Sequence, residues 1–378
     1  MRRVVLTGVG VLNAAIGGGS AALGAYLGAP RSALRPTGAA PGRLVAELAP
    51  SALAGLVDAT ETRRLSRVCQ FAVAAARLAL ADAGLEPSDE LGLVVGTEFG
   101  DLGSTVEFAD GYLERGPAGL SALLFPSTVM NTMAAASAIA VVAKGLSLTL
   151  NAPAVAGELA VARAAALVRT GRLEVALAGG VDQIDPLRMR MLAELGAASD
   201  VRGEGATFVV LEALPVALER RARVLGEILG ASWSALPARP HGVGRHAGSR
   251  AIAAALEAAA TALDEVGWVY ASASGDWARD AWERALLAAA LGGAPRAVAS
   301  LGFLVGHHAG AGALGVAAGA WTSRSGLLPV TAAPGADADR APAPVAPVRV
   351  RPGPGLVHGV ARGGTHVALA VGPPPGSQ

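Results

Sequence analysis

The sequence predicts an α/β protein in which mixed β-sheets are covered by helices. Short runs rich in Val, Ile and Leu alternate along the chain with long Ala-rich runs, an order that is typical of layered α/β folds. This series of strands and helices occurs twice in a similar order. We therefore expect two similar halves, residues 1–214 and residues 222–378, which divide near Leu214–Arg221.

Each expected strand is a short apolar run bounded by turn-forming residues, and each expected helix is a longer run with helical apolar spacing. The strands expected in the first half are Arg3–Val11, Leu91–Thr97, Ser147–Asn151, Val175–Ala178 and Thr207–Leu211. Those expected in the second half are Val224–Ser232, Trp268–Ser272, Ala297–Leu301, Gly355–Val360 and Thr365–Val371. The expected helices are Glu61–Ala83, Val129–Lys144, Gly157–Thr170, Gly248–Glu265 and Asp276–Leu291. Two Pro-rich stretches, Leu328–Pro354 and Gly372–Gln378, are not expected to form regular helices.

The composition limits the functions that this chain can have. Of its 378 residues, 52% are hydrophobic and only 4% are aromatic, so small side chains must build a large core. The net charge is +1 and no basic, aromatic-interleaved run occurs, which argues against nucleic-acid binding. Cys69 is the only Cys and lies in an apolar helical run, so we expect a buried structural thiol. A chain with one Cys forms no internal disulfide, which fits a reducing cytoplasm.

No stretch of the sequence predicts a membrane segment. The apolar run after Arg2 and Arg3 is short and is broken by Gly8 and Gly10, so a strand followed by a turn explains it better than a signal peptide. The Ala-rich stretch 132–143 is about 12 residues long, too short to span a bilayer.

The segment around Ala154 has the layout of a nucleophile site without a nucleophile. A buried strand, Ser147–Asn151, leads through a tight turn into an apolar helix that starts near Gly157. The positive end of a helix lowers the pKa of a Cys at this position, and the resulting thiolate attacks thioesters. The methyl group of Ala154 has neither property.

Several motifs together resemble one enzyme family. They are the opening Arg2-Arg-Val-Val-Leu-Thr-Gly-Val-Gly10, the run from Arg63 to Gly84, the segment Phe125-Pro-Ser-Thr-Val-Met-Asn131, and the pairs around Gly179-Gly180 and Gly203-Glu-Gly-Ala206. Over nearly its full length the chain resembles the β-ketoacyl-ACP synthases, the condensing enzymes of the thiolase fold. The resemblance implies a thiolase-like fold with an α-β-α-β-α layering. It also places Ala154 opposite the family's usual Cys.

The other catalytic positions of the family are also altered. The resemblance places Ser272 at a His position, Gly302 at a Lys position and Arg362 at the Phe of a Gly-rich loop, while His307 keeps its His. Condensation needs a thiol and two donors that stabilise an enolate oxygen. We therefore expect no catalytic residues in this chain and no chemistry by this chain alone.

The resemblance extends to a subfamily that lacks the Cys, the chain-length factors of type II polyketide synthases. It implies a heterodimer with an active ketosynthase whose acyl tunnel this chain completes, so that it limits the length of the polyketide. The substrate is expected on the phosphopantetheine arm of an acyl carrier protein, and neither a bound cofactor nor a metal is expected. The subfamily commonly has Gln where this chain has Ala154, and this difference favours a highly reducing or polyene-type pathway. The small side chains at Ala134–Ala138 favour the same type of pathway. The residues expected to line the tunnel at the interface are Ala122, Leu124, Phe125, Thr128, Val129 and Met133.

Two alternatives remain open at this point. In the first alternative to the chain-length-factor role, the chain is a residual malonyl-ACP decarboxylase or hydrolase that uses His307. In the second, it is an acyl-binding scaffold that docks the carrier protein through exposed Arg side chains. His307 also has a structural interpretation, as a hydrogen-bonded His beside His308.

Overall fold

The computed structural model describes residues 2–36, 43–194, 200–245, 248–293, 296–329 and 346–376. The strands of the first half are β1 (Val4–Asn13), β5 (Gly92–Thr97), β6 (Ser147–Asn151), β7 (Val175–Asp182) and β9 (Gly205–Ala213). Those of the second half are β10 (Gly226–Ala235), β11 (Trp268–Tyr270), β12 (Ala297–Ala299), β15 (Gly355–Val360) and β16 (Thr365–Gly372).

The strand order repeats between the two halves. The first half is ordered β1-β9-β7-β5-β6 and the second is ordered β10-β16-β15-β11-β12. In each half the outer pairs are parallel and the inner pairs are antiparallel. The halves join where β1 pairs with β10 over Val4–Leu6 alone. The predicted α/β class with mixed strands is confirmed.

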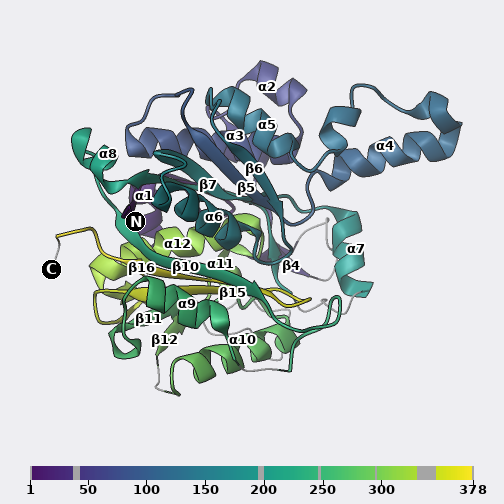
Figure 1. Ribbon diagram of the computed structural model, residues 1–378. Helices are drawn as coiled ribbons and strands as arrows, with labels where there is room; N and C mark the ends of the chain where they lie inside the picture. Colours follow the sequence, from purple (N-terminus) through teal and green to yellow (C-terminus); the bar gives the residue numbers. More distant parts are fainter. Residues whose placement is uncertain are drawn as a thin grey trace.

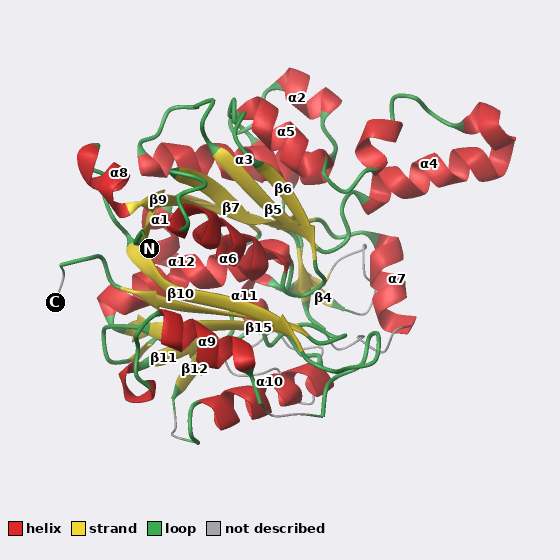
Figure 2. Ribbon diagram, in the orientation of Figure 1, coloured by secondary structure: helices red, strands yellow, loops and turns green. Residues whose placement is uncertain are grey.

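Five layers of helix and strand stack on one another (Figure 1). Two long helices, α6 (Ala156–Arg169) and α12 (Ala309–Ser325), lie between the two strand series. The outer face of the first series is covered by α3 (Arg67–Ala83) and α5 (Thr132–Ala140), and that of the second by α9 (Arg250–Ala258) and α10 (Trp277–Ala290), as Figure 2 shows.

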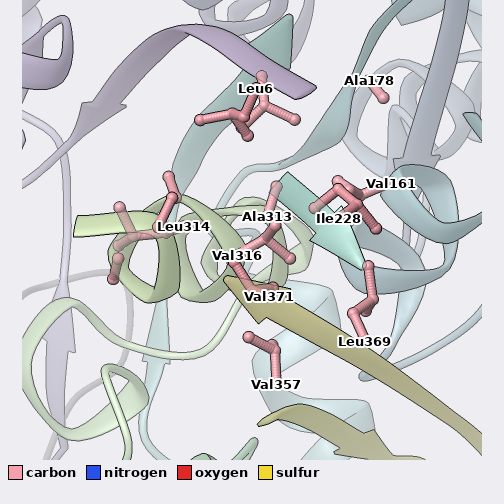
Figure 3. Packing of buried hydrophobic residues seen from close by; sticks show 14 of the residues in the cluster. Leu6, Val161, Ala178, Ile228, Ala313, Leu314, Val316, Val357, Leu369 and Val371 are labelled. Atoms are coloured by element: carbon pink, nitrogen blue, oxygen red, sulfur yellow. The ribbon is translucent and has the colours of Figure 1, made fainter. Parts of the chain in front are cut away.

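Aliphatic side chains from the central helices and both strand series form the main core (Figure 3). Val161 of α6 and Val316 of α12 pack there with Leu6 of β1 and Val371 of β16. The two central helices approach closely, since a Cβ at Gly157 would lie only 1.9 Å from the carbonyl oxygen of Ala309. The high content of small residues is what permits this spacing.

The structure differs from the predicted elements mainly in its helices. The run predicted as one helix over 61–83 is two helices, α2 (Ala59–Arg64) and α3, because Leu65 is extended and Ser66 is the N-cap of α3. The two longest helices that were not predicted are α12 and α4 (Leu102–Arg115). Most of the Pro-rich stretch Leu328–Pro354 lies outside the described residues.

The remaining elements are short. The helices are α1 (Ser20–Gly28), α7 (Pro186–Glu194), α8 (Leu214–Glu219) and α11 (Gly302–Val305), and the 3₁₀ turns are η1 (Pro50–Leu53), η2 (Gly116–Gly119), η3 (Phe125–Thr128) and η4 (Leu263–Glu265). The strands are β2 (Gly17–Gly18), β3 (Arg35–Pro36), β4 (Leu44–Ala46), β8 (Arg202–Gly203), β13 (Leu327–Leu328) and β14 (Val348–Arg349). No helix in the described part of the chain is both long enough and apolar enough to cross a membrane.

Candidate functional site

Ala154 occupies a sharp turn between β6 and α6. Its φ is +65°, the left-handed region that L-residues rarely adopt, and this conformation costs about 1–2 kcal/mol. A strained strand-to-helix turn is the backbone arrangement that nucleophile elbows use. The backbone at Ala154 therefore has the kind of strained turn that such elbows use, and the side chain at the turn is a methyl group.

Three of the predicted positions line one small cavity. Ser272, Gly302 and His307 line it together with Glu158 and His358, and its volume is about 20 Å³. A cavity of this size holds about one water molecule. Ala154 does not line it, although Glu158 one turn further along α6 does. In this conformation the cavity has no room for an acyl thioester.

Ser272 donates to a carboxylate and not to an imidazole. Its hydroxyl donates to Glu283 Oε1 at 3.0 Å and accepts from the Val360 N–H at 3.2 Å. His358 Nδ1 lies 2.9 Å from the same Glu283 oxygen. Burial alone would raise the pKa of Glu283, but the hydrogen bond and charge of His358 lower it. The base on the Ser272 hydroxyl is thus a carboxylate whose pKa is lowered, which makes it too weak a base to activate a serine as a nucleophile.

His307 is part of a buried ion-pair cluster. Glu98 Oε2 accepts from Arg188 Nη2 and Arg202 Nη1, each at 2.8 Å. His307 Nδ1 lies 3.3 Å from Glu98 Oε1 and 3.2 Å from Arg202 Nη1. Burial raises the pKa of Glu98, but the two guanidinium groups outweigh it and hold that pKa well below its usual range. This geometry matches the structural interpretation of His307.

A second cluster fixes the backbone around Ser272. Arg279 Nη2 donates to the Ser272 carbonyl at 2.8 Å and to Ser274 Oγ at 2.5 Å. The Ser274 hydroxyl donates to Asp200, whose carboxylate pairs with Arg202 at 2.8 Å. Asp280 accepts from the Gly275 N–H at 2.8 Å. The two clusters thus connect through Asp200 and Arg202 and hold the walls of the cavity together.

Glu158 is a buried acid that the sequence reasoning did not single out. Burial raises its pKa to about 8. Its carboxyl group occupies space that two glycines leave open. A Cβ at Gly312 would lie 1.9 Å from Glu158 Oε2, and one at Gly359 would lie 2.9 Å from Glu158 Oε1. A single acid in the otherwise apolar start of α6 was the available signal in the sequence.

Arg362 anchors the Gly-rich turn between β15 and β16. Its guanidinium forms a two-pronged pair with Asp276, at 2.5 Å and 2.6 Å, and donates to the His241 carbonyl at 2.9 Å. Asp276 is also the N-cap of α10. The turn is therefore tied to the start of the helix that carries Glu283.

The predicted interface residues do not share one environment. Ala122, Phe125 and Val129 are exposed, and Leu124 and Thr128 are half-buried. Met133 is the exception, because its side chain is fully buried in this chain's own core. Burial in this chain's own core does not favour a place in a partner's tunnel, and the assignment of Met133 to that tunnel stays a prediction.

The acids and histidines near the cavity are spread out or already paired. Within the described ranges, no three His, Cys, Asp or Glu side chains are grouped as a metal ion requires. Glu98 is paired with Arg188, and Glu283 is paired with His358. The pKa of Glu158 is strongly raised by burial.

Comparisons with known proteins identify the family of the chain. Residues 49–217 match the family described as "Beta-ketoacyl synthase, N-terminal domain". The tetracenomycin polyketide synthase ketoacyl synthase beta subunit of Streptomyces glaucescens is 36% identical over 300 residues, 72% of each chain. The 3-oxoacyl-[acyl-carrier-protein] synthase 2 of Synechocystis sp. is 30% identical over 67% of this chain and 68% of that protein.

Solved structures match over nearly the whole chain. The ishigamide ketosynthase/chain length factor superposes with a TM-score of 0.85 at 26% identity and covers 99% of both chains. A type II PKS acyl-carrier protein in complex with its ketosynthase bound to the hexaketide gives a TM-score of 0.84 at 21% identity, with the same coverage. The fold is the thiolase-like ketosynthase fold, and the chain belongs to the β-ketoacyl synthase family.

Proposed function

We propose that this chain is a noncatalytic, chain-length-factor-like subunit that forms a heterodimer with an active ketosynthase. The observation that carries the proposal is the cavity at the former active site. It is lined by Ser272, Gly302 and His307 and holds about one water molecule. His307 is paired with Glu98 and Arg202 there. Similarity to a ketoacyl synthase beta subunit and to a ketosynthase/chain length factor structure supports the same role.

The heterodimer is supported by an unpaired strand edge and an apolar surface beside it. Among the strands that the structure describes, β6 ends the sheet and pairs with β5 alone, and an open edge is a template for another chain. Near it the arm, defined here as residues 102–128, projects from the body of the molecule at α4 (Figure 1). Leu123 of the arm and Ile139 of α5 expose 92% and 81% of their area, which is typical of an interaction surface.

The finer parts of the proposal rest on the family resemblance and on side-chain size. We infer that exposed arm residues end the partner's acyl tunnel, that the growing chain arrives on an acyl carrier protein, and that the pathway makes a long, linear, polyene-like chain. The predicted cytoplasmic location belongs to the same proposal. The product is inferred from side-chain size and the carrier protein from the family resemblance.

Purified protein tests the central claim. The chain alone is expected neither to elongate acyl-ACP nor to release CO₂ from malonyl-ACP, whereas co-expression with a Cys-containing ketosynthase should give a co-purifying, elongating pair. Mass spectrometry of the acyl-ACP products is the measurement. Elongation by a preparation of this chain alone would overturn the proposal.

The alternative, a decarboxylase or hydrolase that uses His307, has its own test. CO₂ release and free acid are compared between the wild type and His307→Ala. Activity in the wild type that is lost in His307→Ala would favour the alternative. Because His307 contacts Glu98 and Arg202, the melting temperature of the variant must be measured alongside, to separate loss of activity from loss of fold.

A further inference from the structure

We propose that a pocket at the C-terminal end of α12 binds a small phosphate ester, with its phosphate group on Arg324 and Arg351. The pocket lies between that helix end, the turn before β15 and the Pro-rich run that follows β16. Its volume is about 970 Å³, at the upper end of the range of about 300–1,000 Å³ that is common for small-molecule sites. It is separate from the cavity that Ser272 and His307 line, and the proposal does not depend on the proposed function.

Two backbone hydrogen bonds bring Arg324 and Arg351 to the same place in the fold. The Gly353 N–H donates to the Ser323 carbonyl at 3.0 Å, and the Val350 N–H donates to the C-cap carbonyl of α12 at 2.9 Å. The two arginines lie between these bonds on facing segments of the chain. Both are exposed, and both line the pocket.

The other charged groups of the lining leave these two guanidinium groups uncompensated. Arg3 donates to Glu227 through two hydrogen bonds, at 2.8 Å and 2.5 Å. Glu265 accepts from the N-cap N–H of η4 at 2.7 Å, which ties its carboxylate to that turn. Among the residues that the structure describes, no carboxylate forms an ion pair with either arginine of the facing segments.

This arrangement favours a doubly charged anion. Partial burial and the like charge of Arg223 lower the pKa of Arg324, and a bound anion would offset the repulsion. A phosphate group carries a charge of about −1.5 to −2 at pH 7 and accepts paired hydrogen bonds from guanidinium groups. It therefore matches two arginines better than a carboxylate, which carries a single charge.

Proline rings form much of the remaining wall. Pro352 and Pro354 come from the turn before β15, and Pro373–Pro375 follow β16. Because proline fixes φ, these walls are preformed and lose little conformational entropy when a ligand binds. Inorganic phosphate would fill only a small part of this volume, so we expect the phosphate group to carry an organic body.

Titration of the full chain with ribose 5-phosphate tests the proposal, with ribose as the neutral control and inorganic phosphate as the control without an organic body. Isothermal titration calorimetry at low ionic strength gives the dissociation constants, since salt screens exposed charges. We expect ribose 5-phosphate to bind at least about tenfold more tightly than ribose, a factor that one hydrogen bond to a charged group supplies. It should also bind more tightly than inorganic phosphate.

The contrary results are distinct. Absence of ribose 5-phosphate binding would overturn the proposal, and so would equal binding of ribose. Inorganic phosphate that binds as tightly as ribose 5-phosphate would overturn the assignment to an ester.

Three variants place the binding. Arg324→Gln and Arg351→Gln are each expected to weaken ribose 5-phosphate binding about tenfold. Arg349→Gln is the matched control and should leave the affinity within about twofold, because Arg349 is exposed on β14 and does not line the pocket. Equal affinities in all three variants would show that the ester binds elsewhere and would overturn the assignment. Thermal unfolding checks that each variant is folded.

Discussion

At the scale of single residues, the position at which we predict a lost nucleophile has a strained backbone, and the side chains near it are held by a carboxylate. Ala154 keeps a positive φ at the elbow, while the hydroxyl of Ser272 and the ring of His358 converge on Glu283. His358 comes from β15, on a different segment from Ser272. A buried carboxylate such as Glu283 needs partners of this kind, because an unpaired charge there would be destabilising.

Restoring the thiol alone is expected to restore reactivity but not condensation. In Ala154→Cys the new thiol sits before the N-terminus of α6, which favours the thiolate. It should be alkylated by iodoacetamide faster than Cys69, which is buried and whose pKa burial raises. Peptide mass spectrometry measures both sites in the same sample. Elongation activity should stay absent because Ser272 and Gly302 supply neither the imidazole nor the ammonium.

The opposite outcome is easy to recognise. If Ala154→Cys elongates acyl-ACP without any partner, the remaining groups around the cavity suffice for chemistry. The proposal that several altered residues together make this chain noncatalytic would then be wrong.

Glu158 is expected to make the protein less stable as pH rises towards 8. Its pKa is about 8 in the folded state and near 4.5 when it is unperturbed. Between these values the folded state keeps the proton and the unfolded state releases it, so unfolding becomes easier by up to about 1.4 kcal/mol per pH unit. Glu158→Gln removes this term, and its free energy of unfolding should rise relative to the wild type from pH 5.5 to pH 8.

Urea denaturation of both proteins across that range measures the difference. Glu257→Gln, on the exposed face of α9, is the matched control and should change little with pH relative to the wild type. A constant difference between Glu158→Gln and the wild type at all pH values would contradict the raised pKa.

At the scale of elements, periodicity predicted the strands well and the helices less well. Ser147–Asn151 and Gly355–Val360 were predicted with their observed bounds. The helix α12 was missed because it contains Gly310, Gly312, Gly315 and Gly319, and Gly disfavours isolated helices by about 1 kcal/mol each. Close packing against α6 and both strand series outweighs this preference. Such packing is not visible in a local sequence window.

The segment η3 and the residues before it are expected to control product length. Enlarging Ala122 or Thr128 to Phe should shorten the products of the ketosynthase pair, since each methylene excluded from a tunnel loses about 0.8 kcal/mol of burial. The chain-length distribution of the acyl-ACP products is the measurement.

Met133→Leu is a suitable control. Met133 is buried in the core of this chain, and the substitution of Met by Leu conserves side-chain volume. It should leave product length unchanged. If Ala122→Phe and Thr128→Phe also leave product length unchanged in an intact pair, these residues do not end the tunnel.

At the scale of the whole molecule, exposed apolar residues gather on one side, over the arm and α5. Leu123→Asp and Ile139→Asp are each expected to abolish co-purification with the ketosynthase, because a charge must then be buried in the interface. Leu218 of α8 exposes 62% of its area on a distant part of the surface (Figure 1). Leu218→Asp is therefore the control and should co-purify normally.

Size-exclusion chromatography of the co-expressed pair measures the complex. If Leu218→Asp and Leu123→Asp disrupt it equally, the partner does not bind where we propose. If neither does, the arm is not part of the interface.

The sequence by itself determined the fold class and the order of the strands along the chain, because these depend on local periodicity and on motifs. It also predicted, through the family resemblance, that Ala154 stands at a nucleophile position and that other reactive groups are lost. Only the tertiary structure brought Glu158 and His358 to the cavity, placed His307 between Glu98 and Arg202 and buried Met133. These contacts join segments far apart in the chain, and the burial that sets their charges and pKa values exists only once the layers have packed.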